Sequence, residues 1–323
     1  MNAIPKFVRP LVTAGSHPVE TGRYIIATPA VCQLYDVVKQ WIANRVPGGM
    51  IYGKQRFGKT RAIKYLMDQL PLDFGPKLAI FALSMRDYRL PTENTFFEDL
   101  LHAVGHAFIK GKASAKRNRL VEFLHERATE GNSRLIMILD EAQKLHEMQY
   151  RWLVDLHNEL DERGVTVTWL LVGQDELLHQ REVFVTSKRL QIIGRFMVHQ
   201  YSFTGLRSIE DFKRCLECYD DGELTEHPRG SGWSFTRYFF PAAFENGWRL
   251  ATQAKTLWDV FAKVRAERRL PGKAEVPMQY FVGTIEYVLR TYGSLQEMPG
   301  EISVNMWKEA IMSSGYHDAA QYL

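Results

Sequence analysis

The sequence predicts an α/β protein in which a five-stranded parallel sheet is flanked by helices and followed by a helical C-terminal region. Three observations support this fold class. A glycine-rich segment, residues 52–60 (YGKQRFGKT), separates a short apolar stretch from a helical pattern. A run of five apolar residues ends in two acids, Asp140 and Glu141, and three further apolar stretches predict additional strands. Strands that alternate with helical patterns along a chain are typical of parallel sheets.

The composition is that of an ordinary globular protein. The 323 residues allow two domains, and 46% of them are hydrophobic and 24% charged. Three cysteines do not form a disulfide framework, which favours a reducing compartment. The N-terminus lacks the apolar core of a signal peptide, and no run approaches the roughly 18 apolar residues that span a bilayer. We therefore expect a cytoplasmic protein without a membrane partner.

Residues 53–60 match the pattern of a phosphate-binding loop, in which glycine, four residues, glycine, lysine and threonine follow one another. Gly53 and Gly58 permit backbone angles and a close approach that a side chain would forbid. The amides of the loop can then surround a phosphate at the start of a helix. Lys59 is predicted to reach the β and γ phosphates, and Thr60 to bind Mg²⁺ through its hydroxyl. The alternative is a glycine-rich turn with an incidental lysine.

The segments on either side of this loop have the required order of strand, loop and helix. The segment GGMIYG, residues 48–53, predicts a short strand. After the loop, apolar residues recur at helical spacing as far as Pro71, where we expect the helix to end.

A second predicted strand, residues 134–141 (RLIMILDE), ends in the acids that a nucleotide site needs. Its continuous apolar run suits a parallel strand covered on both faces. Asp140 would hold the metal, directly or through water. Glu141 would polarise the water that attacks the γ phosphate. The loop and the two acids together predict an ATPase with ATP and Mg²⁺ as cofactors.

Three more strands are predicted at residues 77–84, 165–174 and 195–203. The second of these (VTVTWLLVGQ) ends at Gln174. Because ligand-facing groups gather where parallel strands end, Gln174 can orient the attacking water. The alternative is a solvated loop residue. Beyond Gly205 the pattern changes to helices.

The loop and the segments ILDEAQKL, LLVGQ and LQIIGRF follow the order found in AAA+ ATPases, which the sequence resembles over roughly residues 20–265. The DEAQ form most resembles the TniB/TnsC-type transposition ATPases and the related ATPases of secretion systems. The resemblance implies an N-terminal segment at 1–48 that leads into the nucleotide site, and a P-loop αβα core at 49–204. It further implies a helical lid at 205–291. Residues 292–323 lie beyond the resemblance and are expected to form a C-terminal tail.

The same resemblance assigns four further residues. Gln174 falls at the sensor position, where Asn, Ser or Thr is more usual. Arg195 matches the arginine that one AAA+ subunit offers to its neighbour's nucleotide, and Arg189 is a rival for that role. Arg249 matches the lid arginine that contacts the γ phosphate.

One basic run fits a DNA partner, although the net charge is only +4. Residues 110–119 (KGKASAKRNR) hold five cations and no acid. In this architecture they lie between the second and third strands, where they can face the channel of a ring or helical filament and bind phosphates without reading sequence. The alternative is a solvated helix face. The predicted DNA-binding residues are Lys112, Lys116, Arg117 and Arg119.

The resemblance implies a regulator of DNA transposition. ATP-bound subunits would form a homo-oligomer, a ring or a helical filament, on double-stranded DNA. They would recruit a transposase and work with a target-selection adaptor protein. Hydrolysis would be slow, would depend on assembly and would dismantle the oligomer. The alternatives are a secretion-type AAA+ ATPase, a nucleotide-gated scaffold and a helicase-loader-like protein.

Overall fold

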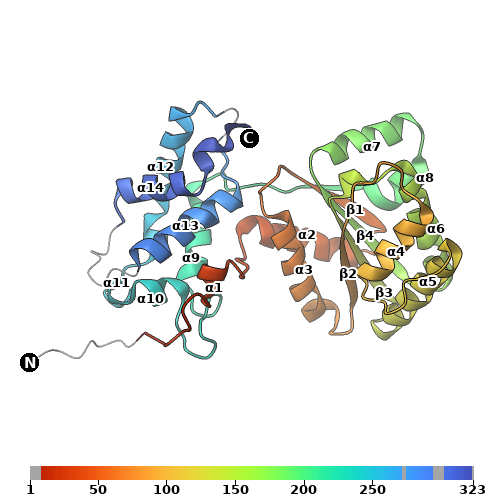
Figure 1. The fold of residues 1–323 in the computed structure, drawn as a ribbon, viewed down its shortest axis with the longest axis horizontal. Coiled ribbons are helices and arrows are strands. Elements are labelled where there is room, and N and C mark those ends of the chain that lie inside the picture. The colour runs from red at the N-terminus through yellow and green to blue at the C-terminus, as the bar shows by residue number, and fades with distance from the viewer. Residues whose placement is uncertain (1–8, 271–273, 294–301, 322–323) are drawn as a thin grey trace, which may run out of the picture. The chain divides into compact units, whose positions relative to one another are not determined.

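The structure, a computed structural model, describes residues 9–270, 274–293 and 302–321 and divides into two compact units (Figure 1). Unit 1 contains the described residues up to Cys32, residues 55–58 and the described residues from Thr204 onward. Unit 2 contains residues 33–54 and 59–203.

Unit 2 is built on a parallel sheet of five strands, in the order β2-β3-β4-β1-β5. All five strands lie within the predicted ranges. Leu135 to Leu139 on β3 are almost completely buried, as a parallel strand covered on both faces requires. The strands are β1 (Gly48–Tyr52), β2 (Ala79–Ser84), β3 (Arg134–Asp140), β4 (Thr166–Gly173) and β5 (His199–Ser202).

Helices cover both faces of this sheet (Figure 1). On one face lie α2 (Pro29–Ala43), which belongs to unit 2 from Gln33 onward, and α3 (Lys59–Phe74). On the other face lie α4 (Glu93–Ala103), α5 (Ala113–Glu130) and α6 (Glu147–Glu162). The short helices α7 (Glu176–Thr186) and α8 (Leu190–Ile192) follow β4. Together with the helical C-terminal region, this arrangement confirms the predicted fold class.

The helix α3 continues through Pro71, so the prediction that it ends there is wrong. Proline has no backbone N–H and disturbs a helix interior. Pro71, however, lies in the last turn, where its carbonyl accepts from the N–H of Gly75 at 3.0 Å. The helix ends at Phe74, and Gly75 takes a φ of +106°, as glycine commonly does after a helix.

Unit 1 is helical and has an aromatic core. The ring of Phe212 lies 5.1 to 5.6 Å from the rings of Trp258, Phe261 and Phe281. The helices of this unit are α1 (Pro18–Thr21), α9 (Ile209–Asp220), α10 (Phe235–Phe239), α11 (Pro241–Glu245), α12 (Ala254–Glu267), α13 (Met278–Tyr292) and α14 (Val304–Ser313). In the part of the chain described, no helix is long and apolar enough to cross a membrane.

The segment predicted to be a C-terminal tail contributes to this core. The helix α14 packs against α12 and α13, and Trp307 is completely buried. Residues 294–301 and 322–323 of the predicted tail lie outside the described residues.

The N-terminal segment is held to unit 1 by His17. Its side chain is 1% exposed, and its ring stacks on Tyr238 at 4.5 Å between centroids. Burial and the neighbouring His227 lower the pKa of His17 to about 3, so the imidazole is neutral inside the fold. The described residues before Cys32 therefore pack as part of the helical unit.

Candidate functional site

The carboxyl end of β3 lies beside the start of α3, which brings Thr60 and Asp140 together. Thr60 Oγ1 donates to Asp140 Oδ2 at 3.0 Å, and Asp140 Oδ1 accepts from the N–H of Glu141 at 3.0 Å. Hydroxyl and carboxylate oxygens are ligands that Mg²⁺ prefers, and Mg²⁺ commonly takes only one or two protein ligands together with water and substrate phosphates. The described residues contain no group of three His, Cys, Asp or Glu that could hold a metal by itself. Thr60 and Asp140 thus fit an Mg²⁺ shared with nucleotide phosphates.

Lys59 is folded back against the loop that precedes it. Its side chain is 8% exposed, and Nζ donates to the carbonyl oxygens of Gly53 at 2.5 Å and Lys54 at 2.7 Å. Burial lowers the pKa of Lys59, although Glu141 and Asp140 act in the opposite direction. Burial also raises the pKa of Asp140. Neighbouring groups therefore compensate each buried charge only in part. A phosphate beside Lys59 and a cation beside Asp140 would supply the opposite charges.

The two glycines of the loop are required for different reasons. A Cβ at Gly53 would lie 2.2 Å from the carbonyl oxygen of Phe203, which follows β5. Strand packing therefore requires glycine at position 53, a reason that the motif alone does not show. Gly58 has a φ of +103°, a conformation that side chains rarely adopt, and so shapes the turn before Lys59.

Two acids that the sequence motifs do not mark lie near Lys59. Asp175 and Glu176 follow Gln174, and both act electrostatically on Lys59. Their place after β4 is the signal that could have identified them, because the carboxyl ends of parallel strands share one edge of the sheet. With Asp140 and Glu141 they make this edge acidic, which favours a divalent cation.

Glu141 occupies a strained turn directly after β3. Its φ of 57° and ψ of 35° are left-handed, a conformation that is uncommon for residues other than glycine and that recurs at functional sites. Glu141 Oε2 accepts from Gln143 Nε2 at 3.0 Å and pairs with Lys144 Nζ at 3.3 Å. The N–H of Gln174 donates to Gln143 Oε1 at 3.3 Å. The predicted catalytic acid and the predicted sensor are therefore connected through Gln143.

The two candidate arginines differ in their surroundings. Arg195 lies in the π-helical turn Ile193–Met197, and its Nη2 donates to Asn158 Oδ1 at 2.6 Å. Its Nε is buried without a hydrogen-bond partner among the residues that the structure describes. The side chain of Arg189 is 43% exposed and pairs with Glu147 at 2.8 Å. Exposed ion pairs are weak, so Arg189 is the easier of the two to redirect towards another molecule. Either role in trans stays a prediction.

Arg249 is held within unit 1. Its Nη1 donates to the carbonyl oxygens of Phe244 at 2.7 Å and Trp248 at 2.8 Å. The guanidinium carbon lies 3.5 Å from the centre of the Phe244 ring. These contacts fix the side chain locally, and its contact with a γ phosphate stays a prediction.

Two cations of the basic run hold α5 against its neighbours. Lys116 is 2% exposed and pairs with Glu98 on α4. Arg117 pairs with Glu159 at 3.6 Å and with Asp155 at 3.7 Å, both on α6. Their charges are already compensated inside unit 2, which favours a structural role over phosphate binding.

The other two predicted DNA-binding residues lie at the beginning of α5, and Arg119 is half-buried there. Lys112 is exposed at the N-cap of this helix. Arg119 donates to the carbonyl oxygen of Lys110 at 2.8 Å, and its guanidinium carbon lies 4.3 Å from the ring centre of Phe108, which is 53% exposed. We call Phe108, Lys110, Lys112 and Arg119 the α5 entry surface.

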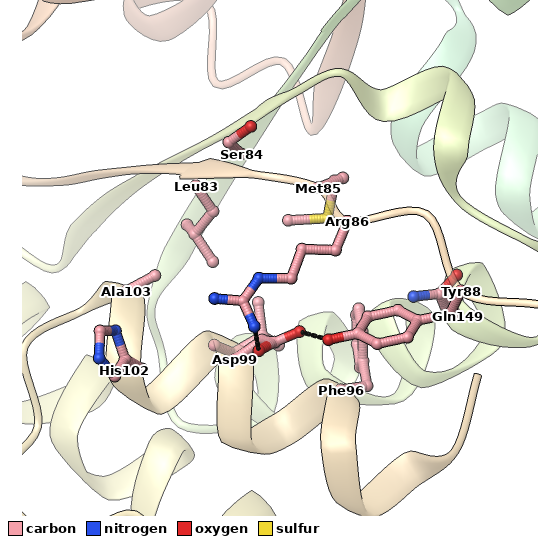
Figure 2. A pocket seen from close by; sticks show the side chains of 11 residues that line it. Leu83, Ser84, Met85, Arg86, Tyr88, Phe96, Asp99, His102, Ala103 and Gln149 are labelled. Atoms are coloured by element: carbon pink, nitrogen blue, oxygen red, sulfur yellow. Dashed lines mark hydrogen bonds and ion pairs between the residues drawn. The ribbon is translucent and has the colours of Figure 1, made fainter.

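A cavity of about 90 Å³ opens at the carboxyl end of β2. Figure 2 shows that Arg86 reaches Asp99 on α4, which also accepts from the hydroxyl of Tyr88. The ion pair measures 3.1 Å and the hydrogen bond 2.6 Å. The cavity has room for a few water molecules but not for a nucleoside triphosphate. The phosphate loop is therefore the candidate nucleotide site.

Comparison with known protein families identifies one match. A family described as "AAA domain" matches residues 47–180, which extend from β1 into α7 and include Lys59, Thr60, Asp140 and Glu141. A search of the curated proteins finds no match.

Solved structures that are similar to this chain include two ORC proteins and one domain of the replication initiation protein DnaA. The ORC2 protein of Aeropyrum pernix, solved as ADPNP-ADP complexes, is 15% identical with a TM-score of 0.61, over 92% of this chain and 71% of that chain. The ORC1 protein of Aeropyrum pernix in complex with DNA is 13% identical (TM-score 0.46), over 90% of this chain and 64% of that chain. Domain III of DnaA from Thermotoga maritima is 14% identical (TM-score 0.46), over 89% of this chain and 93% of that chain. At these identities the likeness to ORC2 shows the fold alone, which is that of an AAA+ P-loop ATPase.

Proposed function

We propose that this chain is an ATP hydrolase that assembles on double-stranded DNA and regulates transposition. The observation that carries the hydrolase is the contact between Thr60 and Asp140, with buried Lys59 and Glu141 beside it. The nucleotides named for the ORC2 structure, which shares the fold, support nucleotide binding by this chain. Loss of ATP binding in Lys59→Ala and loss of turnover in Glu141→Gln are the results that this proposal predicts.

In this reaction the residues of unit 2 have separate tasks. Lys59 would bind the β and γ phosphates. Thr60 and Asp140 would hold Mg²⁺, which neutralises charge on the phosphates. Glu141 would accept a proton from water while the water oxygen bonds to the γ phosphorus. The bond from this phosphorus to the β–γ bridging oxygen breaks, and its electron pair leaves with ADP.

We assign the arginine that acts in trans to Arg189. Arg195 is engaged by Asn158 in its own subunit, whereas Arg189 is exposed and forms a surface pair with Glu147. An arginine that reaches the γ phosphate of a neighbouring subunit makes hydrolysis depend on assembly.

Mixing two inactive variants tests this assignment. Arg189→Ala keeps its nucleotide site but loses the arginine, and Lys59→Ala keeps the arginine but loses the site. Each alone should turn over ATP very slowly. An equal mixture should recover activity, because roughly a quarter of randomly formed heterologous interfaces pair an intact site with an intact arginine. Turnover is measured as phosphate release at several protein concentrations.

Arg195→Ala is the comparison variant in the same assay. If it is rescued by mixing and Arg189→Ala retains full activity alone, the trans role belongs to Arg195. Thermal melting of both variants is required, because removing the arginine bound to Asn158 is expected to destabilise unit 2.

The DNA part of the proposal rests on the α5 entry surface. It combines exposed cations with an exposed aromatic ring, and its lysines are not committed to acids of unit 2 as Lys116 and Arg117 are. Cations of this kind bind phosphates through counterion release, which gives a strong dependence on salt and none on sequence.

The double variant Lys110→Ser/Lys112→Ser is expected to weaken duplex binding equally on unrelated sequences. Loss of two phosphate contacts should reduce the slope of log K against log salt by roughly 2. Binding is measured by fluorescence anisotropy on a labelled duplex with a slowly hydrolysed ATP analogue. Lys64→Ser/Lys77→Ser removes the same charge from exposed positions elsewhere on unit 2 and is the matched control.

An unchanged salt slope in the first variant would show that residues 110–119 form a solvated face and do not bind DNA. Electron microscopy of the same samples reports assembly. Rings or filaments that need both nucleotide and DNA support the regulator, and recruitment of a transposase then separates it from a helicase-loader-like protein. Oligomers that need nucleotide but ignore DNA would favour the secretion-type ATPase or the scaffold.

A further inference from the structure

Gln143 is a residue of the DEAQ segment to which the proposed reaction gives no role. Its side-chain amide is engaged on both sides: Nε2 donates to Glu141 Oε2 at 3.0 Å, and Oε1 accepts from the N–H of Gln174 at 3.3 Å. A carboxylate can only accept a hydrogen bond and an N–H can only donate one, so the orientation of this amide is determined by its two partners.

The backbone after β4 leaves space for this amide. A Cβ at Gly173 would lie 2.3 Å from Gln143 Oε1 and 2.7 Å from Leu177 Cδ1. Glycine at this position therefore lets Gln143 reach the N–H of Gln174. This contact connects the end of β4 to the acid at the end of β3.

The direction of the Glu141 carboxylate depends strongly on its side-chain contacts. Its left-handed backbone belongs to neither β3 nor the short helical turn that follows, so side-chain partners decide where its carboxylate points. The other partner, Lys144, forms an ion pair between half-exposed groups, and such pairs restrict geometry weakly. Gln143 and Lys144 both contact Oε2 of this carboxylate.

We propose that Gln143 is the positioning residue that aims the Glu141 carboxylate at the attacking water, anchored by the N–H of Gln174. This inference rests on the proposed ATP hydrolysis. It also gives the end of β4 a role through its backbone, alongside the role expected of the Gln174 side chain. A misdirected acid slows the chemical step and leaves nucleotide binding unchanged, because Gln143 contacts neither Lys59 nor Thr60.

Two independent variants test the inference. Gln143→Met removes both hydrogen bonds with little change in volume. Gly173→Ala leaves the glutamine in place but puts a methyl group where its Oε1 lies. Each is expected to lower kcat by on the order of tenfold to a hundredfold while the dissociation constant for an ATP analogue stays unchanged. The double variant should be little slower than either single variant, because both break one connection.

Lys144→Met is the matched control, because it removes the other partner of the same carboxylate oxygen. It should change kcat only slightly. Thermal melting of each variant separates misfolding from misdirection.

The outcomes distinguish a failure of the proposed ATP hydrolysis from a failure of the positioning role of Gln143. A wild-type chain without ATP turnover overturns the hydrolase itself. A wild-type chain that hydrolyses ATP, with normal kcat in folded Gln143→Met, overturns only the positioning role. Additive effects in the double variant would also overturn it, because they would show that Gly173 and Gln143 act separately.

Discussion

Replacing Lys59 with alanine is expected to abolish binding of ATP at physiological concentrations. The ammonium is the only cation of the loop that is buried beside Thr60 and Asp140 among the described residues. A hydrogen bond to a charged group contributes about 1.5–3 kcal/mol, and this ammonium would reach two phosphates. The expected loss of affinity is on the order of a hundredfold or more.

Isothermal titration with ATP and Mg²⁺ measures this change directly. Lys64→Ala is the matched control, because Lys64 lies on the exposed side of the same helix and carries the same charge. The variant should stay folded, since it removes a buried charge whose pKa burial already lowers. Unchanged ATP affinity in folded Lys59→Ala would falsify the assignment of the nucleotide site.

Replacing Glu141 with glutamine is expected to leave nucleotide binding intact and to reduce turnover by about 10² to 10⁴-fold. The amide has the shape of the carboxylate and can still accept from Gln143, but it cannot take a proton from water. If hydrolysis dismantles the assembly, oligomers formed with ATP should persist in this variant and disappear in the wild type.

Phosphate release and sedimentation of the assembled protein are the two measurements. Glu162→Gln, an exposed position near the end of α6, controls for the loss of one negative charge. Normal turnover in Glu141→Gln would remove this residue from the mechanism and direct attention to Asp175 and Glu176, the other acids that act on Lys59.

The short-range features of this protein follow from its sequence. The strands β2, β3 and β4 were predictable because continuous apolar runs bounded by polar residues have few other places in a fold. The strand β5 (HQYS) lies within its predicted range but is not itself apolar, because most of the apolar residues of that range precede it. The meeting of Thr60 and Asp140 was predictable too, because the phosphate loop and the acid-ending strand are each defined by local pattern. The continuation of α3 through Pro71 was not, because proline is expected to disturb a helix, and here the helix nevertheless continues to Phe74.

Apart from Thr60 and Asp140, the partners of the charged and polar side chains were decided only by tertiary structure. Sequence shows Lys112 and Lys116 as equivalent cations of one run, yet one is exposed and the other is buried against Glu98. Lys112 is the N-cap residue that precedes α5, whereas Lys116 lies one turn inside the helix, where α5 packs against α4. Where the helix begins relative to α4 follows from the assembly of the whole unit. For the same reason, the sequence does not distinguish Gln143 from other residues that follow a strand. Its partners become known only when the fold places Gly173 and Gln174 of the β4 end beside it. Local patterns follow from backbone geometry within a few residues, whereas the partner of a side chain depends on segments distant in the chain.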